Sequence, residues 1–451
     1  MRIFSGDRET GFYCLPVCGS QESALFESSA QAEAAGFKAC PDCRPDRVER
    51  PVSGELPELV CRAVQLVLHG SLDAHTEPAL ERELAVSSRH LRRLFARYVG
   101  VTPDQLGRSR RVHFARRLID DTDLPMADIA FAAGFGSVRQ FNRELSQVFD
   151  APPSVLRSRH RGDRRSTDGG LEVDLNTAPS YDWDSVLEQL AYWAVPGVES
   201  VQARTYRRTI TVEGYHGLIE IYPDDSRGTD NPIRGTRLKA RIHLPVWHQV
   251  VHLIGRANTM TGLEFDDDSG QRTLRETELG GLVNRRPRLR VAGAWDGFEV
   301  MVSALLTEHE NDDKALRLLV DRYGTRLEGL PAGLTHVFPS PTVLESADLT
   351  TLDLPPGIAE SIREIAARVR TRQLDLTAGV DHDGLTADLR DIPGVSDGVV
   401  EQVALRLGYR DAWPNSHPRI NRTIAARPDD PDAQSWRPWR SLATTYLLLD
   451  A

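Results

Sequence analysis

The sequence predicts a multidomain α+β protein, and three observations carry that prediction. The chain has 451 residues, more than a single hydrophobic core usually organises, so two to four domains are expected. Four of its five cysteines fall within one short N-terminal window. Alternating apolar residues in "RRTITVEGYHGLIEIYP" predict strands, whereas helical spacing of apolar residues precedes this stretch and returns from about Trp295.

These patterns separate a cysteine-rich segment, residues 1–50, from an all-helical segment, residues 56–160, and from a longer C-terminal part that begins at residue 171. The polar, glycine-ended stretch "HRGDRRSTDGG" between the last two is expected to be a linker. No apolar run approaches the roughly 20 residues that span a bilayer. The opening "MRIFSGDRET" has no apolar signal segment. We therefore expect a cytoplasmic protein with no membrane partner.

The cysteines follow the pattern Cys14-x3-Cys18-x21-Cys40-x2-Cys43. Two close pairs of thiolates are able to surround a tetrahedral Zn²⁺. Clustered cysteines in a protein without a secretory signal favour metal binding or catalysis over disulfides. The spacing leaves two alternatives open, a structural zinc site and a reactive one.

The strings "TGFYCLPVC" and "SSAQAEAAGFKACPDCRPD" resemble the zinc domain of Ada-type methylphosphotriester DNA methyltransferases. The resemblance implies that Cys14, Cys18, Cys40 and Cys43 bind Zn²⁺ and that Cys14 also accepts a methyl group irreversibly. A thiolate is the nucleophile that such a transfer needs. Four thiolates outweigh the charge of one zinc ion, so methylation of one sulfur would reduce the repulsion of DNA. Leu15 stands where the family usually has an arginine.

Positive charge is concentrated in the helical segment. From Arg82 to Arg165 there are 17 arginines and no lysine against 9 Asp and Glu residues, which is about +8. The whole chain carries −10, so the remainder carries about −18 (−10 − 8 = −18). A basic module within an acidic chain indicates local DNA binding, and a solvated arginine-rich surface is the alternative.

Two stretches of this segment predict helix-turn-helix units. "EPALERELAVSSRHLRRLFARYVGVTP" contains an N-cap at Ser87 or Ser88, and the apolar spacing gives one buried face. That face is formed by Leu91, Leu94, Phe95 and Tyr98. "LPMADIAFAAGFGSVRQFNRELSQVFDAPP" repeats the plan, with an apolar face formed by Ile129, Ala133, Val138, Phe141, Leu145 and Val148.

Two such units joined by the helix that contains "RRVHFARRLI" resemble the AraC-type DNA-binding domain. The resemblance implies a role in transcription regulation, with double-stranded DNA as a partner and RNA polymerase as a further candidate partner. Side chains suited to phosphates and base edges lie on the polar faces. The predicted DNA contacts are Arg89, His90, Arg92, Arg93, Arg139, Gln140, Asn142 and Arg143.

Residues 171–451 resemble AlkA-type 3-methyladenine DNA glycosylases. The resemblance rests on "APSYDWDSVLEQLAYWAVPGVESVQARTYRRTI", "RPRLRVAGAWDGFEVMVSALL" and "WRPWRSLATTYLL". It implies an antiparallel α+β domain over residues 171–285 and an all-α helix–hairpin–helix domain over residues 286–451. Such enzymes extrude a damaged nucleotide and cleave its glycosidic bond with the help of an aspartate. Over its whole length the chain resembles Ada–AlkA fusion proteins.

The glycosylase motifs depart from the family pattern. The hairpin "IPGVSDGVVEQVALRLG" keeps Pro393, Gly394 and Val395, which the resemblance implies direct backbone N–H groups to a DNA phosphate. The departures are Ser396 for the second glycine, Gly398 for a tryptophan, His417 for the catalytic aspartate in "DAWPNSHPRI", and Glu308 and His309 of "LLTEHEN" for a glycine–glutamine segment.

These departures bear on base excision. A histidine does not supply the fixed negative charge that a sugar cation needs beside it. Asp397 and Asp411 are near in sequence but do not match the catalytic position. A lyase route is not expected, because the chain has three lysines, none of them in the hairpin: Lys38, Lys239 and Lys314.

We therefore predict a zinc-containing, DNA-binding regulator of the alkylation response, with methyl capture at Cys14 and a glycosylase-like half that is catalytically impaired. The alternative is an active DNA-3-methyladenine glycosylase II fused to a methylphosphotriester methyltransferase and regulator. In that alternative, His417 would act as a general base.

Overall fold

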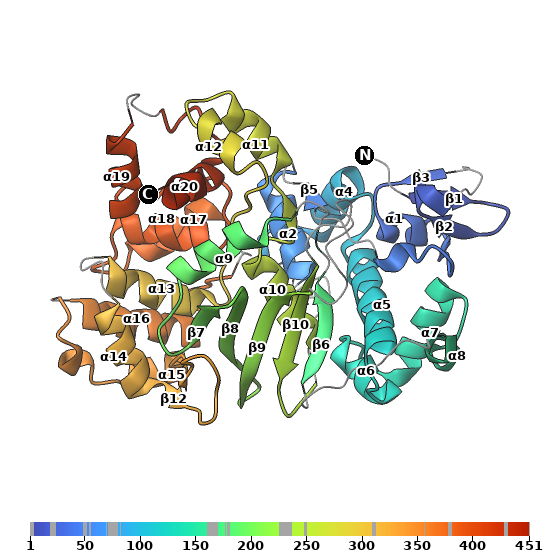
Figure 1. Cartoon of the computed structure of the whole chain (residues 1–451), viewed down its shortest axis with the longest axis horizontal. Coiled ribbons are helices and arrows are strands. Elements are labelled where there is room, and N and C mark those ends of the chain that lie inside the picture. The colour runs from blue at the N-terminus through green and yellow to red at the C-terminus, as the bar shows by residue number, and fades with distance from the viewer. Residues whose placement is uncertain are drawn as a thin grey trace. The chain divides into compact units, whose positions relative to one another are not determined.

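The computed structural model describes the chain except residues 1–3, 19–23, 48–51, 54–55, 69, 71–79, 82, 160–169, 176, 178–180, 225–236, 248–249, 309–312, 356, 378–380, 428–431 and 451. Two compact units are present (Figure 1). Unit 1 comprises residues 1–52, 56–178 and 237–256, and unit 2 comprises residues 53–55, 179–236 and 257–451. Within the described ranges, no helix is both long enough and apolar enough to cross a membrane.

Unit 1 begins with a small sheet in the strand order β3-β1-β2-β4. Its strands are β1 (Phe4–Asp7), β2 (Phe12–Cys14), β3 (Ala24–Phe26) and β4 (Lys38–Ala39), with α1 (Ser29–Ala34) between the last two. Strands β2 and β4 pair in parallel, with Tyr13 opposite Ala39. The carboxyl ends of parallel strands lie at the same edge of a sheet, so this pairing brings the residues that follow Tyr13 and Ala39 together.

The helical part of unit 1 follows the two predicted helix-turn-helix units. Its helices are α2 (Glu58–Leu68), α4 (Ser88–Tyr98), α5 (Pro103–Asp121), α6 (Met126–Ala132), α7 (Val138–Phe149) and α8 (Pro153–Arg159). The hydroxyls of Ser87 and Ser137 accept backbone N–H bonds at the starts of α4 and α7, as serine N-caps do. The long helix α5 contacts α2, α6, α7 and α8 (Figure 1).

One residue of the predicted apolar faces lies elsewhere. Leu91 and Phe95 of α4 are buried, and Leu94 packs partly buried against the same cluster. Tyr98 was predicted to join them, but it is 36% exposed. This prediction is wrong because Tyr98 is the last residue of α4, where the Arg97 guanidinium, 5.2 Å from the ring centroid, covers the ring instead.

Unit 1 also contains the antiparallel pair β6 (Leu171–Leu175) and β10 (Leu238–His243). The division between the units falls within α10 (Val250–Met260). The predicted linker lies almost entirely outside the described residues, since only its last glycine, Gly170, is described. The four predicted domain boundaries therefore stay predictions.

The strand region of unit 2 is an antiparallel meander of β7 (Glu199–Gln202), β8 (Thr205–Val212) and β9 (Tyr215–Pro223). Strands β8 and β9 are the strands that period-two alternation predicted, and they pair as a hairpin. Tyr206 pairs with Ile221 and Arg208 with Ile219. The apolar residues of these pairs are buried, which ties the sheet to the core of the unit.

The rest of unit 2 is mostly helical, as predicted from Trp295 onward, with three short strands in the described residues, the first of which is β11 (Phe265–Asp266). Its helices are α9 (Trp183–Tyr192), α11 (Asp268–Arg275), α12 (Gly280–Arg285), α13 (Gly297–Thr307), α14 (Lys314–Tyr323), α15 (Pro341–Glu345), α16 (Ile358–Arg370), α17 (His382–Arg390), α18 (Asp397–Arg406), α19 (Pro418–Ala425) and α20 (Arg440–Leu449). Strands β12 (Thr325–Arg326) and β13 (His336–Val337) pair antiparallel. One apolar cluster runs through α13, α16, α18 and α20.

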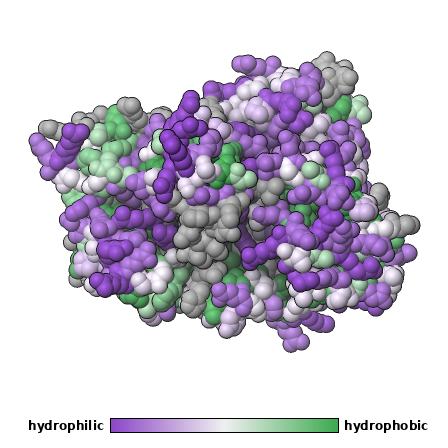
Figure 2. Space-filling model, turned by 180° about the vertical axis from the view of Figure 1, so that it is seen from behind, coloured by the Kyte–Doolittle hydropathy of each residue, from purple (hydrophilic) through white to green (hydrophobic). Residues whose placement is uncertain are grey.

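Hydrophilic residues predominate on the face of the molecule shown in Figure 2.

Candidate functional site

The structure brings the four predicted cysteines together. Their Sγ atoms all lie within 4.8 Å of one another. A tetrahedral zinc ion with Zn–S bonds of about 2.3 Å separates its sulfurs by about 3.8 Å, so the cluster has the right size. Cys14 ends β2, and Cys40 follows β4 and donates its backbone N–H to Tyr13 O at 3.1 Å. The parallel strands β2 and β4 therefore position one cysteine from each pair.

The donor set also fits a cation on electrostatic grounds. Burial and the neighbouring sulfurs raise the pKa of Cys14 and raise that of Cys43 to about 12. At Cys40 burial acts in the same direction, but backbone N–H groups of Cys43 and Asp42 outweigh it and lower the pKa. Four adjacent thiolates thus repel one another, and a divalent cation between them is what allows all four to be deprotonated.

The two sulfurs of the first pair differ in access. Cys14, the predicted methyl acceptor, is 5% exposed, whereas Cys18 is exposed. The Cys43 Sγ atom accepts the backbone N–H of Leu15 at 3.3 Å, which holds the first pair against the second. The family resemblance therefore favours Cys14 as the acceptor, while exposure favours Cys18.

In the first helix-turn-helix unit, the predicted DNA contacts lie on the solvent side of α4. Arg89, Arg92 and Arg93 are exposed and His90 is half-buried. The Arg93 guanidinium lies 3.0 Å from His90 Nδ1. Three cations on one exposed helix face form a surface that suits phosphates.

In the second unit, α7 presents Arg139, Asn142 and Arg143 to solvent. Gln140 is half-buried, and its side-chain amide donates to Glu144 Oε1 at 3.0 Å. A carboxylate on the same helix thus already binds the amide that was predicted to read a base. Among the predicted contacts of α7, the three exposed side chains remain directly available to DNA.

The predicted hairpin is present between α17 and α18. Pro393 and Gly394 are exposed, Gly394 has a φ of +81°, and Val395 packs against the helical core. Ser361 Oγ donates to the carbonyl oxygen of Pro393 and fixes the turn. Ser396 is the N-cap of α18, where its hydroxyl accepts the Val399 N–H at 3.1 Å, so it stabilises the helix.

His417 is enclosed at the start of α19. Its Nδ1 accepts the Arg419 N–H at 3.3 Å, and its Nε2 lies 3.1 Å from the Tyr192 hydroxyl oxygen. The Trp193 ring packs edge-on, with centroids 5.8 Å apart. Burial, with the charges of Arg419 and Arg422, lowers the pKa of His417 to about 4. The imidazole is therefore neutral at neutral pH, and both of its nitrogens have partners.

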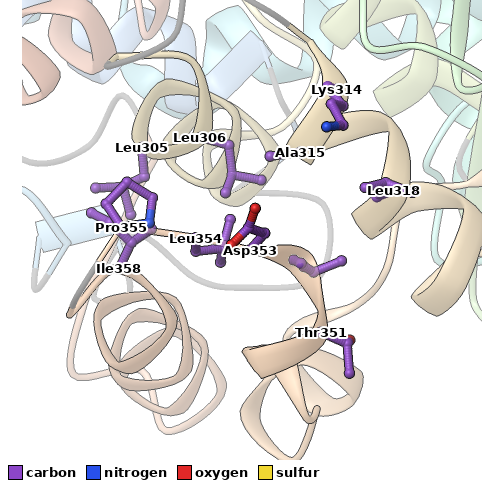
Figure 3. Close-up of a pocket in the computed structure, with 11 residues that line it drawn as sticks. Leu305, Leu306, Lys314, Ala315, Leu318, Thr351, Asp353, Leu354, Pro355 and Ile358 are labelled. Atoms are coloured by element: carbon purple, nitrogen blue, oxygen red, sulfur yellow. The ribbon is translucent and has the colours of Figure 1, made fainter.

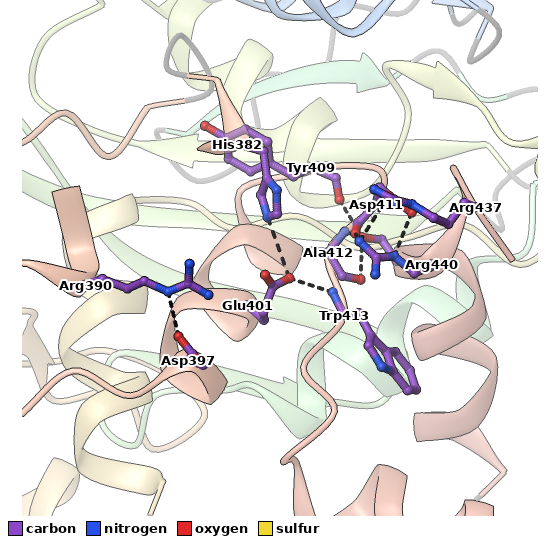
Figure 4. A network of polar contacts seen from close by, with 11 residues as sticks. His382, Arg390, Asp397, Glu401, Tyr409, Asp411, Ala412, Trp413, Arg437 and Arg440 are labelled. Carbon is purple, nitrogen blue, oxygen red and sulfur yellow. Dashed lines mark hydrogen bonds and ion pairs between the residues drawn. The ribbon is translucent and has the colours of Figure 1, made fainter. Parts of the chain in front are cut away.

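The carboxylates that lie near His417 in the sequence have partners of their own (Figure 4). Asp397 accepts from Arg390 Nε at 2.6 Å, and Asp411 bridges Arg437 and Arg440 at 2.8 Å each. Glu401 accepts the Trp413 N–H at 2.7 Å. Among the residues that the structure describes, no carboxylate hydrogen-bonds to His417.

A small cavity in unit 2 has no predicted site residue in its lining. It measures about 110 Å³ and is lined mainly by apolar side chains of α13, α14 and the segment from Thr351 to Ile358, with Lys314 and Asp353 (Figure 3). Ligand pockets are usually larger, about 300 Å³ or more. Lys314 belongs to α14, Lys38 to β4 and Lys239 to β10. None of the three lysines is on the hairpin, as the sequence predicted.

Three family descriptions match the chain in succession. Residues 1–46 match the metal binding domain of Ada, residues 80–159 match a helix-turn-helix domain, and residues 172–296 match the AlkA N-terminal domain. With the four-cysteine cluster, the first match assigns Zn²⁺ as the metal of this domain.

The relatives include one that spans nearly the whole chain. The probable bifunctional transcriptional activator/DNA repair enzyme AlkA of two Mycobacterium tuberculosis strains is 30% identical over 461 residues, which covers 97% of this chain and 90% of that protein. The chain belongs to the Ada–AlkA fusion family. DNA-3-methyladenine glycosylase 2 of Escherichia coli is 30% identical over 60% of this chain and 95% of its own. The bifunctional transcriptional activator/DNA repair enzyme AdaA of Bacillus subtilis is 26% identical over 31% of this chain and 67% of its own.

The departures from the Ada–AlkA pattern meet one another in space. Ser396 Oγ hydrogen-bonds to Glu308 Oε1. A Cβ added at Gly398 would lie 2.0 Å from Ser416 Oγ and 3.4 Å from Glu308 Oε1. A side chain at this position, where the family commonly has tryptophan, therefore requires Ser416 to shift. His309, the other member of the "LLTEHEN" departure, lies outside the described residues.

Sequence reasoning missed the aromatic residues that enclose His417. Tyr192 is the last residue of α9, and Trp193 follows it directly. His417, the hydrogen-bond partner of Tyr192, lies 225 residues later in the chain. The Arg419 guanidinium lies 4.8 Å from the Tyr192 ring centroid, and that of Arg406 lies 5.2 Å from the Trp193 centroid. The adjacent aromatic pair in "LAYWAV" was the available signal, but its partner is not readable from spacing along the chain.

Proposed function

We propose that this Ada–AlkA family member is a zinc-containing DNA-binding regulator of the alkylation-damage response whose glycosylase-like half does not excise bases. The relatives whose names combine transcriptional activation with DNA repair support the first part. The enclosure of His417 carries the second part. The exposed arginines on α4 and α7 are the proposed contacts to double-stranded DNA, and contact with RNA polymerase remains a prediction.

In the metal-binding domain, Cys14, Cys18, Cys40 and Cys43 are the proposed zinc ligands. When bound, Zn²⁺ keeps the cysteine sulfurs deprotonated at neutral pH. The Cys14 sulfur then attacks the methyl carbon of a methylphosphotriester. The bond between that carbon and the ester oxygen breaks, and its electron pair remains on the oxygen. A phosphodiester anion is restored, Cys14 becomes a thioether, and the cluster becomes less negative, which favours DNA binding.

The position of the methyl group is testable, because Cys14 and Cys18 differ in exposure. After incubation of the full chain with methylphosphotriester DNA, we expect peptide mass spectrometry to find one added methyl group on Cys14. A methyl group on Cys18 would reassign the acceptor to the exposed sulfur. A chain that stays unmodified, while free methylphosphotriester persists, contradicts methyl capture.

Loss of base excision follows from the chemistry of the sugar. Cleavage of a glycosidic bond develops positive charge on the sugar, and a carboxylate beside it stabilises that charge. At the corresponding position this chain has a neutral imidazole with two hydrogen-bond partners. To act as a general base, His417 would have to give up the Tyr192 or the Arg419 contact.

The deciding assay uses purified full-length protein and duplex DNA that contains 3-methyladenine or hypoxanthine. We expect no base release above background from the wild type, and measurable release from His417→Asp. Aspartate is a good N-cap for α19, and the adjacent Arg419 and Arg422 favour its charged form. Release by neither protein leaves the half without excision activity and shows that the other departures also matter.

An active DNA-3-methyladenine glycosylase is the second candidate function. The 30% identity over 95% of the Escherichia coli glycosylase favours it. Robust base release by the wild type would establish this alternative and overturn our proposal for the C-terminal half, without affecting the metal centre or the DNA-binding helices.

A further inference from the structure

Buried ion pairs join the metal-binding segment to helix α5 within unit 1. The Arg44 guanidinium, which directly follows Cys43, donates to Asp46 and to Asp120 of α5 at 2.7 Å each. Arg116, one turn earlier on α5, lies 3.1 Å from Asp120. Both carboxylate side chains are 1% exposed. Although burial favours its neutral form, the Arg44 guanidinium lowers the pKa of Asp46, so this carboxylate stays charged.

A second chain of contacts begins beside the other cysteine pair. Tyr13 directly precedes Cys14 and is fully buried. Its hydroxyl donates to Glu33 Oε1 of α1 at 3.0 Å, and the same oxygen lies 2.5 Å from His113 Nε2 of α5. His113 is 3% exposed. Each cysteine pair is thus connected to α5 through the residue next to it in sequence.

The two contact points lie on one face of α5. His113 and Asp120 are seven residues apart, which is about two helical turns. Helix α5 packs against α6 and α7 of the second helix-turn-helix unit. On the side of the first unit, Gln31 of α1 donates to the carbonyl oxygen of Val99, which caps the end of α4. The metal-binding segment therefore contacts the supports of both DNA-binding helices.

Because these contacts are buried, they tolerate little change in geometry. An ion pair taken out of water is stable only with good geometry, and loss of one partner leaves an uncompensated buried charge. If the segments that carry Cys14 and Cys43 shift, Tyr13 and Arg44 move with them. A cavity of about 140 Å³, lined by Cys40, Arg44 and Arg116 among others, lies at this seam.

We propose that Arg44–Asp120 and Tyr13–Glu33–His113 are positioning contacts through which the state of the metal centre sets the DNA affinity of the helix-turn-helix units. Zinc binding and DNA binding are then thermodynamically coupled through α5. The inference rests on the proposed function, in that duplex DNA is the ligand, and it deepens that function by naming the residues that carry the regulation.

The test compares the DNA affinity of zinc-loaded and zinc-free full-length protein, with a mixed-sequence duplex as the probe. We expect zinc removal to weaken wild-type binding about tenfold, within the usual range of coupling between two sites. Asp120→Asn leaves Arg44 paired with Asp46, and Glu33→Gln keeps an oxygen that accepts from Tyr13. Each variant should therefore retain one zinc per chain and bind DNA within about twofold of the zinc-loaded wild type. In each variant the effect of zinc removal should fall to about threefold or less.

Asp128→Asn is the matched control, because it removes the same charge from an exposed position on α6. It should keep the tenfold effect. Reciprocity supplies a measurement that needs no variant, since duplex DNA must raise the zinc affinity of the wild type by the same factor. Wild-type binding that is independent of zinc, or variants that keep the full effect, would overturn the inference and leave the proposed function intact. A zinc-loaded wild type that does not bind duplex DNA would overturn both.

Discussion

Unit 1 and unit 2 differ in the contacts that their predicted functional residues make. In unit 1 the four cysteines converge without a compensating charge of their own, and the arginines of α4 and α7 face solvent. In unit 2, Glu308 and Ser396 bond to each other, and His417 bonds to Tyr192. A cluster of thiolates that repel one another needs a cation to complete it, whereas Ser396, Glu308 and His417 already have hydrogen-bond partners within the chain.

Zinc removal gives the largest expected effect and tests unit 1. Cys40→Ala removes one of four ligands, and we expect the bound zinc to fall from one per chain to none, with loss of the cooperative unfolding of this small domain. Metal analysis and thermal unfolding measure the two effects. Cys61→Ala is the control, because Cys61 lies on α2 outside the cluster and its loss should leave the zinc in place. Full zinc content in Cys40→Ala would contradict the assignment of Cys40 as a zinc ligand and remove the contrast between the two units.

Acid titration of the folded protein tests whether His417 of unit 2 is enclosed. The unfolded chain protonates His417 near its ordinary pKa of 6.5, but the folded chain does so only near 4. Stability from this group is therefore fully present above about pH 6.5 and is lost as the pH falls toward 4. After allowance for partial exposure, the loss is on the order of 2 kcal/mol.

Denaturant unfolding from pH 7 to pH 4 measures this loss in the wild type and in His417→Gln. The glutamine variant should show a flatter profile, because its side chain does not titrate. Identical profiles for the two proteins would mean that His417 is solvated and accessible, and the contrast with unit 1 would weaken.

A pair of glycine substitutions gives the smallest expected effect. Gly398→Ala places a methyl group 2.0 Å from Ser416 Oγ, whereas a Cβ at Gly281 of α12 meets nothing within 4 Å. Both changes raise helix propensity, by up to about 1 kcal/mol. We expect Gly398→Ala to be less stable than Gly281→Ala by about 1–2 kcal/mol, because only the former overfills its site. Urea unfolding of the full chain compares them, and equal stability would show that Ser416 moves away at no cost.

Local signals in the sequence predicted much of the fold. The N-cap Ser87 and the strands β8 and β9 follow from residues close together in the chain. The spacing of the cysteines predicted their convergence, because zinc geometry constrains it. Tyr98 was misplaced because helical periodicity takes no account of where a helix ends. Each of these signals depends on neighbours within a few turns.

The partners of the departures were not predictable from the sequence. Tyr192 and His417 are separated by 225 positions, and Ser396 and Glu308 by 88. A departure from a family motif can be read from the sequence, but the partner that the substituted residue finds is set by tertiary packing. The pairing of Arg44 with Asp120, across 76 positions, was missed for the same reason.

The contact between Gly398, Ser416 and Glu308 makes substitutions in this region depend on one another. A bulky ring at position 398 requires Ser416 to be displaced, and a glycine at position 396 leaves α18 without its cap and Glu308 without its hydroxyl partner. Each substitution taken alone therefore removes a contact that the present side chains make. A redesign of this surface has to exchange these residues together.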